Sequence, residues 1–138
     1  MTGFWSSAHE FVCDGVPLSA IAEAEGTPLY VYSAAELRRR YAAIETAFSG
    51  YPHAVHYALK ANSNLALLGL LRAAGASADA NSIWEIDVAR RAGFDPGQIV
   101  FTGVGKSGVE LRQAVPLGLK AINVESAGEL DRVEMLAA

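Results

Sequence analysis

Short apolar runs alternate along most of the chain with longer segments of helical periodicity. The apolar runs are typical of buried strands, and they predict strands near residues 54–60, 76–80, 98–102 and 120–124. A Ser-x-x-Glu pattern, which starts helices by pairing side-chain oxygens with free backbone N–H groups, recurs four times, and glycines stand where helices should end. The chain is therefore predicted to consist of βα units. The four patterns begin at Ser33, Ser82, Ser107 and Ser126, and the glycines are Gly75, Gly93 and Gly118.

Residues 1–32 show a different pattern, with short strands and turns around one brief helix. Asp14-Gly15 is a tight-turn dipeptide that follows the β-rich stretch Phe11–Cys13. A helix is predicted over Pro17–Glu25, and the β-branched and aromatic residues of Leu29–Tyr32 predict a strand. This part is expected to be a short β/α segment ahead of the βα units.

Alternation of strands and helices indicates a parallel sheet with right-handed crossovers, for which two architectures are open. A doubly wound sheet would suit 138 residues as a complete domain, whereas a (β/α)₈ barrel needs eight strands and roughly 250 residues. The strand near 54–60 favours the barrel because one of its faces carries His56 and Lys60, while doubly wound strands tend to be apolar on both faces. We therefore expect an α/β fold that is a partial (β/α)₈ barrel, its first four βα units preceded by the N-terminal segment. The helix that begins at Ser126 is expected to be still running at Ala138.

The composition favours a piece of a larger core. Hydrophobic residues make up 51% of the chain and charged residues 19%, with a mean hydropathy of +0.21. A small complete domain has a high surface-to-volume ratio and usually carries more polar residues. Some apolar surfaces are therefore expected to be covered by chain outside these 138 residues.

Charge and targeting signals argue against several functional classes. The formal net charge of −4 gives no electrostatic footprint for nucleic acid, and the one dense basic run, Arg38–Arg40, lies in a helical pattern beside acidic residues. Cys13 is the only cysteine, which fits a reducing compartment. A signal peptide begins with a basic region, but no Lys or Arg precedes Arg38. The apolar run Leu65–Leu71 is too short to span a bilayer. We expect a cytoplasmic protein that binds neither nucleic acid nor membrane.

The chemistry-bearing candidate is Lys60, at the carboxyl end of a predicted parallel strand, where barrel enzymes carry their active sites. A lysine amine in water has a pKa of roughly 10.4 and is a poor nucleophile at neutral pH. Desolvation at a barrel mouth lowers that pKa and permits a covalent bond with an aldehyde cofactor. The spacing alone leaves a second interpretation open, in which Lys60 simply leaves the strand for solvent.

The segment Tyr57-Ala58-Leu59-Lys60-Ala61-Asn62 resembles the cofactor-lysine motif of the barrel-type pyridoxal-phosphate decarboxylases, a family that includes ornithine, arginine and diaminopimelate decarboxylases. The resemblance extends in order across nearly the whole chain, and several ordered motifs are far more specific than one. Within the family, Lys60–Asn64, Val104–Lys106 and Asn123–Ser126 look most like the diaminopimelate decarboxylases. The other similar segments are Gly26–Tyr32, Ala78–Ser82 with Glu85, Ile99–Lys106 and Glu129-Leu130.

The resemblance implies pyridoxal 5′-phosphate as the cofactor, held covalently by the catalytic residue Lys60. Asp79 is similar to the aspartate that lies beside the cofactor, and the lysine motif assigns Ala58 to the same wall of the site. Glu85 and Ser82 resemble residues that support this side of the site, although both also belong to a predicted helix start. No metal is implied.

The resemblance also implies a reaction and an assembly. The substrate would be a small amino acid, meso-diaminopimelate, converted to L-lysine and carbon dioxide in the last step of lysine biosynthesis. Residues 1–32 would belong with the family's β domain and residues 33–138 would form the first half of the cofactor-binding barrel, in a homodimer of the full-length protein. The family's glycine-rich phosphate loop has no counterpart in this chain, so the 138 residues alone are expected to be inactive.

Three other functions stay open beside this one. Two belong to the same barrel class: ornithine or arginine decarboxylation, and an amino-acid racemase. The third is a small doubly wound binding domain without cofactor. None of the residues that would recognise the distal end of a substrate lies in this chain by resemblance, so the substrate is the least constrained expectation.

Four further residues are predicted to have structural or solvent-exposed roles rather than chemical ones. His56 lies four positions before Lys60 and is expected to be structural, and Trp84 is expected to pack. Gly103-Val104-Gly105-Lys106-Ser107 lacks the full spacing of a phosphate-binding loop, so Lys106 is predicted to be a solvated loop residue. Lys120 is predicted to begin a strand at the opposite end of the barrel.

Overall fold

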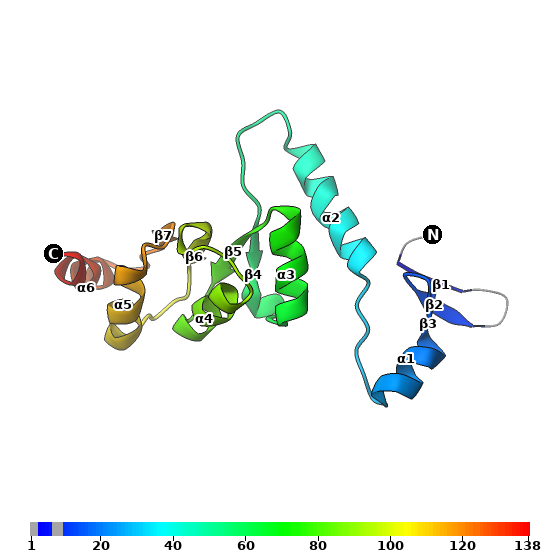
Figure 1. Cartoon of the computed structure of the whole chain (residues 1–138). Coiled ribbons are helices and arrows are strands. Elements are labelled where there is room, and N and C mark those ends of the chain that lie inside the picture. Colours follow the sequence, from blue (N-terminus) through cyan, green and yellow to red (C-terminus); the bar gives the residue numbers. More distant parts are fainter. Residues whose placement is uncertain (1–2, 7–9) are drawn as a thin grey trace. The chain divides into compact units, whose positions relative to one another are not determined.

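The computed structural model describes residues 3–6 and 10–138, and the chain forms two compact units, one up to Gly50 and one from Tyr51 to Ala138 (Figure 1). The first unit begins with three short strands in an antiparallel sheet of order β1-β2-β3 and continues through two helices. Its elements are β1 (Phe4–Ser6), β2 (Phe11–Cys13), β3 (Val16–Pro17), α1 (Leu18–Glu25) and α2 (Ala34–Ala47). The predicted turn and first helix are thus confirmed.

Asp14 organises the first unit. It sits in the turn between β2 and β3 with a φ of 49°, in the left-handed region where Asp is better tolerated than most residues. Its carboxylate accepts hydrogen bonds from Ala35 N at 3.0 Å, Ser33 Oγ at 2.8 Å and Gly3 N at 2.8 Å. These donors, led by the Ala35 N–H, lower the pKa of Asp14. The hairpin turn is therefore tied to the start of α2.

Two predictions about aromatic residues are wrong. Leu29–Tyr32 is irregular rather than a strand, because no described strand lies alongside to complete a hydrogen-bonded ladder, and Tyr30 is 90% exposed. Aromatic and β-branched content favours a strand only where a neighbour is available. Trp84 is 62% exposed, since it faces away from the core on the first turn of its helix while Ile86 is buried.

The second unit is built from βα units, as predicted. Its four parallel strands are hydrogen-bonded in the order β4-β5-β6-β7, so β4 and β7 are the two edges. Each strand lies within its predicted range but is shorter. The elements are β4 (His56–Ala58), α3 (Leu65–Ala74), β5 (Ser77–Ala80), α4 (Ile83–Arg91), β6 (Ile99–Phe101), α5 (Gly108–Ala114), β7 (Ala121–Ile122) and α6 (Ala127–Ala137), with 3₁₀ turns η1 (Leu59–Ala61), η2 (Pro96–Gln98) and η3 (Val115–Leu117).

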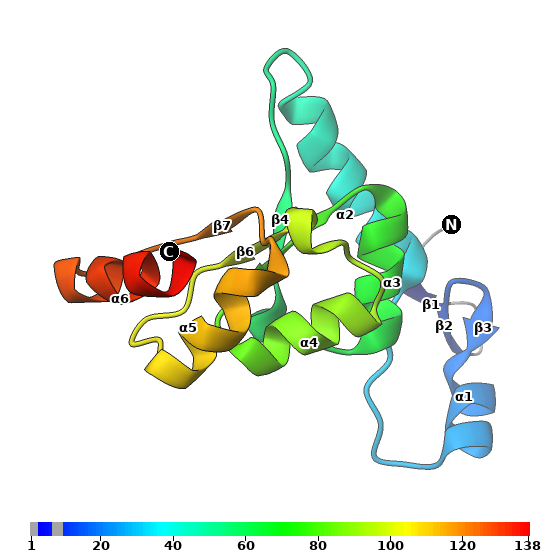
Figure 2. The ribbon, with the colours of Figure 1, turned by 60° about the vertical axis from the view of Figure 1, so that its left-hand side comes forward.

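One face of the parallel sheet carries the core. Register partners in a parallel sheet point to the same side, and Ala78 pairs with Ile99 as Ala80 pairs with Phe101. These four side chains are fully buried against helices α3, α4 and α5, which lie next to one another on that face (Figure 2). The cluster comprises Leu59, Leu68, Ala78, Ala80, Ile86, Val88, Ala89, Phe94, Ile99, Phe101 and Ala114.

The opposite face mixes polar and apolar side chains and lies outside that core. Of its residues His56, Ala58, Ser77, Asp79, Val100 and Ala121, only Ser77 is buried. A doubly wound sheet would have helices packed on both faces. A sheet with helices on one face and mixed side chains on the other has instead the layering of a (β/α)₈ barrel wall, in which the second face is the barrel interior.

All four predicted helix starts are confirmed in their serine half. The Oγ atom of each N-terminal serine accepts from the backbone N–H three residues on. The reciprocal half, in which the glutamate accepts from the serine N–H, is formed at Ser107 and Glu110. The other three glutamates are engaged elsewhere: Glu36 by Arg39 and Arg40, Glu85 by the N–H of Asn81, and Glu129 by Lys106.

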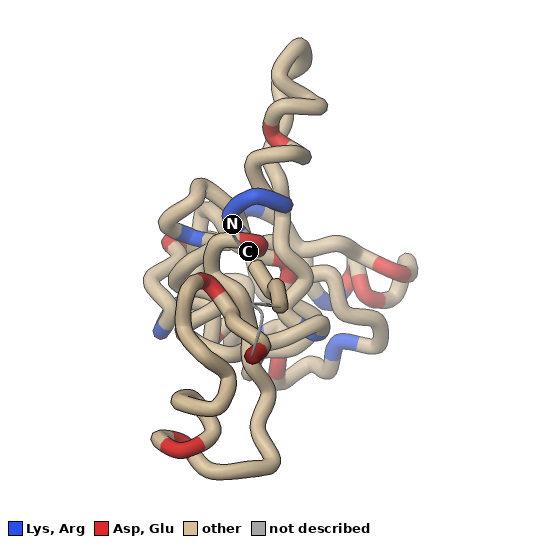
Figure 3. Tube along the Cα trace, turned by 90° about the vertical axis from the view of Figure 1, so that its right-hand side faces the viewer, with Lys and Arg blue, Asp and Glu red and all other residues tan. Residues whose placement is uncertain are grey.

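Charged residues are spread along the chain, with Lys and Arg interspersed among Asp and Glu (Figure 3). The dense run Arg38–Arg40 lies exposed on α2, where Arg39 and Arg40 pair with Glu36, as expected of a solvated helix face. Within residues 3–6 and 10–138, no helix combines the length and apolar character needed to cross a bilayer.

Candidate functional site

Lys60 lies in the 3₁₀ turn η1, directly after β4, and its side chain is exposed. The strand ends two residues earlier than the lysine, but the residue still leaves the carboxyl end of the sheet, as predicted. Its neighbour Leu59 is 1% exposed and anchors the turn in the core. No described residue forms an ion pair or hydrogen bond with the Lys60 amine, so the turn presents a primary amine to the surroundings.

The residues that follow Lys60 hold this turn in place. Tyr57 Oη donates to the carbonyl oxygen of Asn62 over 3.2 Å, which closes the turn from strand to loop. Asn62 Oδ1 accepts from the N–H of Asn64 at 3.0 Å, and Asn64 Oδ1 in turn caps α3 by accepting from Ala66 N at 2.9 Å. The tyrosine and the two asparagines therefore fix the backbone of the turn from which Lys60 projects.

Asp79 lies on the neighbouring strand, on the same face of the sheet as Ala58. The two residues are register partners between β4 and β5, and the small Ala58 side chain leaves the aspartate room. Asp79 Oδ1 is buried, and none of the described residues donates a hydrogen bond to it. A buried carboxylate oxygen normally has a partner, so an unpaired one at this position fits a site whose ligand supplies the donor.

Three polar residues that received no role in the sequence analysis extend this site. Asn81, Thr102 and Asn123 each come directly after a strand, one position beyond the row that pairs Ala80 with Phe101. Alternation along the strands places them on the same face as Asp79. Asn123 Nδ2 donates to Thr102 Oγ1 over 3.2 Å, while Asn81 Nδ2 is buried and has no partner among the described residues.

These three, called the polar row below, could have been found from sequence. Each is the first polar residue after an apolar strand, and side chains at the carboxyl ends of parallel strands gather at one edge of the sheet. The row adds amide and hydroxyl groups on the face that carries Asp79, at the end of the sheet where Lys60 follows β4. Such a set can bind a polar ligand through its hydrogen-bonding groups and attack an aldehyde through the amine.

Ser82 and Glu85 shape the loop between β5 and α4. Ser82 Oγ accepts from Glu85 N at 3.2 Å, and Glu85 Oε2 accepts from Asn81 N at 2.7 Å. Glu85 therefore holds the backbone of Asn81, and Ser82 caps the helix start that carries Glu85. Glu110 adds a link from the next unit, because its carboxylate accepts from Ile83 N at 3.4 Å as well as from its own helix start. The pKa of Glu110 is lowered chiefly by the Ser107 N–H.

The other two lysines differ from Lys60, and one prediction about them is wrong. Lys106 is buried and ion-paired rather than solvated, because the loop after β6 folds back and directs its amine toward Glu129. Lys120 does precede β7 at the opposite end of the sheet, as predicted, and its Nζ lies 3.2 Å from His56 Nε2. His56 also contacts the carbonyl oxygen of Ala78 at 3.3 Å, which agrees with a structural role.

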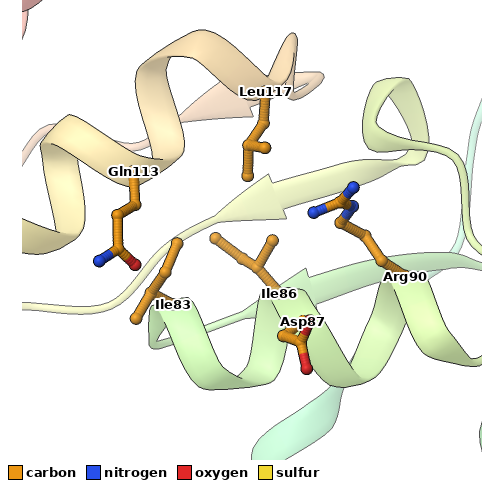
Figure 4. Close-up of a pocket in the computed structure, with 6 residues that line it drawn as sticks. All are labelled: Ile83, Ile86, Asp87, Arg90, Gln113 and Leu117. Atoms are coloured by element: carbon orange, nitrogen blue, oxygen red, sulfur yellow. The ribbon is translucent and has the colours of Figure 1, made fainter.

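A shallow pocket of about 160 Å³ lies elsewhere, between α4 and the α5–η3 segment (Figure 4). Ile83, Ile86 and Leu117 converge on it, and Arg90 and Gln113 flank it. None of the predicted site residues lines it. It belongs to the helical layer and is separate from the polar face of the sheet.

Comparison with known proteins places this geometry in a family. The family described as "Pyridoxal-dependent decarboxylase, pyridoxal binding domain" matches residues 34–138, and the chain belongs to this family. It is 46% identical over 129 residues to a diaminopimelate decarboxylase of Pseudomonas aeruginosa, covering 94% of this chain and 31% of that protein. A diaminopimelate decarboxylase of Vibrio cholerae is 45% identical over 122 residues, covering 88% and 29%.

Solved structures agree with the fold. A diaminopimelate decarboxylase from M. jannaschii in co-complex with L-lysine superposes with a TM-score of 0.91 at 32% identity, over 99% of this chain and 33% of that one. The Helicobacter pylori enzyme complexed with L-lysine gives a TM-score of 0.82 at 40% identity, over 86% and 30%. The partial-barrel prediction is thus confirmed against the doubly wound alternative. The chain spans about a third of the length of the relatives it matches.

Proposed function

We propose that the full-length protein containing this chain decarboxylates meso-diaminopimelate to L-lysine, with pyridoxal 5′-phosphate as cofactor. The observation that carries the proposal is a family match over residues 34–138 that includes a free amine at the carboxyl end of a barrel strand. Relatives named diaminopimelate decarboxylase cover most of this chain at 40% identity or more, and two solved relatives were crystallised with L-lysine.

The residues present fit such a cofactor. An aldehyde needs an amine that no other group occupies, which Lys60 offers, and the buried Asp79 oxygen, which has no donor among the described residues, can accept from a group bound beside that amine. Pyridoxal phosphate, when bound, supplies an electron sink for the pair of electrons left behind as carbon dioxide departs. We assign Lys60 as the catalytic residue and Asp79 and Ala58 as further cofactor-binding residues.

The chain's own residues perform the steps around that sink. Lys60 would hold the cofactor through its aldehyde, and its amine, when free, would carry a proton at the reacting carbon. Asp79 accepts a hydrogen bond from the bound group at its unpaired oxygen. Glu85 and Ser82 act indirectly: Glu85 fixes the backbone of Asn81, and Ser82 caps the helix start that carries Glu85.

The proposal extends to domain boundaries, assembly and location. We assign residues 1–32 to the β domain of the full-length protein and residues 33–138 to the first half of the barrel, supported by the family match that begins at residue 34 and by the antiparallel sheet of the first strands. We further propose a homodimer in the cytoplasm. Sedimentation of the full-length protein at several concentrations tests the dimer, and a monomer throughout would contradict it.

Lysine labelling tests the cofactor assignment. The full-length protein is incubated with pyridoxal 5′-phosphate and reduced with borohydride, which makes an amine–pyridoxal linkage permanent. Peptide mass spectrometry should find the added mass on the Lys60 peptide and not on those of Lys106 or Lys120. Lys60→Ala should lose cofactor attachment, whereas the matched control Lys120→Ala should keep it. Label on another lysine, or unchanged attachment in Lys60→Ala, would overturn the assignment.

Substrate choice needs its own experiment. Released carbon dioxide is measured for the full-length protein with meso-diaminopimelate, ornithine and arginine in separate reactions. The highest kcat/KM is expected for meso-diaminopimelate. Faster turnover of ornithine or arginine would replace the substrate and leave the Lys60 chemistry intact, and racemisation without carbon dioxide release would indicate the racemase alternative.

A further inference from the structure

The buried lysine of the chain joins two neighbouring loops. Lys106, in the loop between β6 and α5, is 3% exposed. Its Nζ donates to the backbone carbonyl of Asn123 over 2.6 Å and to Glu129 Oε1 over 2.8 Å, and it lies 5.3 Å from the centroid of the Phe101 ring. Both acceptors belong to the next βα unit, since Asn123 follows β7 and Glu129 lies in the first turn of α6.

Stability alone is a poor explanation for this ion pair. Both side chains are almost fully buried, and taking two charges out of water is unfavourable even when they meet. Apolar residues of similar volume often stabilise a core equally well or better. An ion pair with a second hydrogen bond does supply geometry, because the amine satisfies both acceptors only within a narrow range of loop positions.

The ion pair of Lys106 and Glu129 is connected to the polar row. Lys106 holds the backbone of Asn123, whose side chain donates to Thr102 Oγ1. Thr102 is the first residue of the loop between β6 and α5, and Lys106 lies near its end. Asn123 therefore holds this loop near both ends, through its side chain and through its carbonyl oxygen. Between Thr102 and Lys106, a Cβ built on Gly103 would overlap the backbone carbonyl of Asn81, which shows how closely the loop packs on the preceding unit. Three consecutive βα loops are therefore locked together.

We propose that Lys106 and Glu129 are positioning residues for the cofactor site: their ion pair holds the polar row in place at the edge of the sheet where Lys60 and Asp79 lie. This inference rests on the proposed function, because it concerns how that same site is kept in shape. Neither residue touches the cofactor, since the Lys106 amine is already committed to Asn123 and Glu129.

The test uses four variants of the full-length protein with pyridoxal 5′-phosphate as the probe. Lys106→Met and Glu129→Gln each break the ion pair, Lys106→Met combined with Glu129→Met replaces it by an apolar pair, and Arg112→Met is the control on the exposed side of α5. Three quantities are measured: the unfolding temperature of the apo-protein, the Kd of the cofactor by titration, and kcat with KM.

The single variants should lower the unfolding temperature, weaken cofactor binding and reduce kcat by on the order of 10²-fold, the loss that a displacement of about 1 Å can cause. The double variant should regain the unfolding temperature while Kd and kcat stay impaired, and Arg112→Met should resemble the wild type. If Lys106→Met does not fold, Glu129→Gln and the double variant still decide.

A double variant that regains cofactor affinity and kcat together with stability would reduce the pair to a structural role. A Lys106→Met protein with a lower unfolding temperature but unchanged Kd and kcat would do the same. Either outcome leaves the proposed function standing, because wild-type protein would still bind the cofactor at Lys60. Failure of the wild type to bind pyridoxal 5′-phosphate would instead overturn the proposed function itself.

Discussion

The loop after β4 and the loop after β6 both follow a parallel strand, but the surroundings of their lysines differ. Each follows a short parallel strand, and each carries one lysine. Lys60 projects from a rigid turn with an exposed amine that no described residue engages, whereas the Lys106 amine is buried between a carboxylate and a carbonyl. The same residue type is therefore left exposed in one loop and is fixed by partners in the other, two strands apart.

Under the roles that we propose for the two lysines, this difference separates chemistry from positioning within one barrel wall. A reactive amine must be free to leave any partner, so its position has to be set by the backbone, here through Leu59 and the Tyr57–Asn62 hydrogen bond. A positioning amine must have partners that do not leave. Burial and pairing strengthen its electrostatic interactions, because the surroundings screen them less than water does.

The largest expected difference between the two loops is in how much the free energy of unfolding falls when the lysine of each loop is replaced. In the apo form of the full-length protein, Lys106→Met should cost about 3–5 kcal/mol of unfolding free energy, because Glu129 is left as a buried, unpaired carboxylate. Lys60→Met should change it by no more than about 0.5 kcal/mol, as for other exposed positions. Chemical denaturation measures both, and equal effects would remove the distinction between the loops.

Amine reactivity should follow the same division. Under limiting acetylation of the apo-protein, Lys60 should react faster than Lys106 by roughly 100-fold or more, since Lys106 reacts only when its loop opens, at a cost of about 3 kcal/mol. Peptide mass spectrometry follows both sites, with the exposed Lys120 as an internal reference. Comparable rates at Lys60 and Lys106 would mean that the ion pair opens readily.

The close approach at Gly103 offers a third way to disturb the loop after β6. Gly103→Ala should destabilise the protein by about 1–3 kcal/mol, because the added methyl group meets the carbonyl oxygen of Asn81. Gly69→Ala is the matched control on α3: nothing lies near its added methyl group, and alanine in a helix should stabilise by up to about 1 kcal/mol. A neutral Gly103→Ala would show that the loop has room to shift.

A smaller, pH-dependent effect is expected at Glu110, which joins the starts of α4 and α5. Its pKa is lowered, chiefly by the Ser107 N–H, so its contribution is fully present above the ordinary carboxyl pKa and is lost as pH falls through the lowered value. Glu110→Gln should cost about 1 kcal/mol at neutral pH, the usual size of a helix-cap contribution. Denaturation across pH 2–7 should show this cost vanishing in acid, and a cost that stays constant would contradict the assignment.

Much of the fold could be read from local patterns. Strand positions and the serine caps followed from apolar runs and capping residues, because these depend on contacts within a few residues. The predictions of a strand at Leu29–Tyr32 and of a packed Trp84 were wrong. The first required an adjacent strand and the second an adjacent apolar surface, and no described residue supplies either. In the site, Lys60 was located correctly at the carboxyl end of β4, while the polar row was missed.

The four Ser-x-x-Glu patterns show where sequence stops and tertiary structure takes over. The sequence by itself determined that a helix starts at each serine, since the hydroxyl needs only the N–H three residues on. Three of the glutamates take donors within four residues of themselves: arginines on the same helix, the N–H of the preceding loop or the N–H of the cap serine. Only the tertiary structure decided that the fourth, Glu129, takes the buried Lys106, because that donor comes within reach only when two loops pack together. For the same reason, the sequence could place Lys106 in its loop but could not show that Glu129, 23 residues later, would bury its charge.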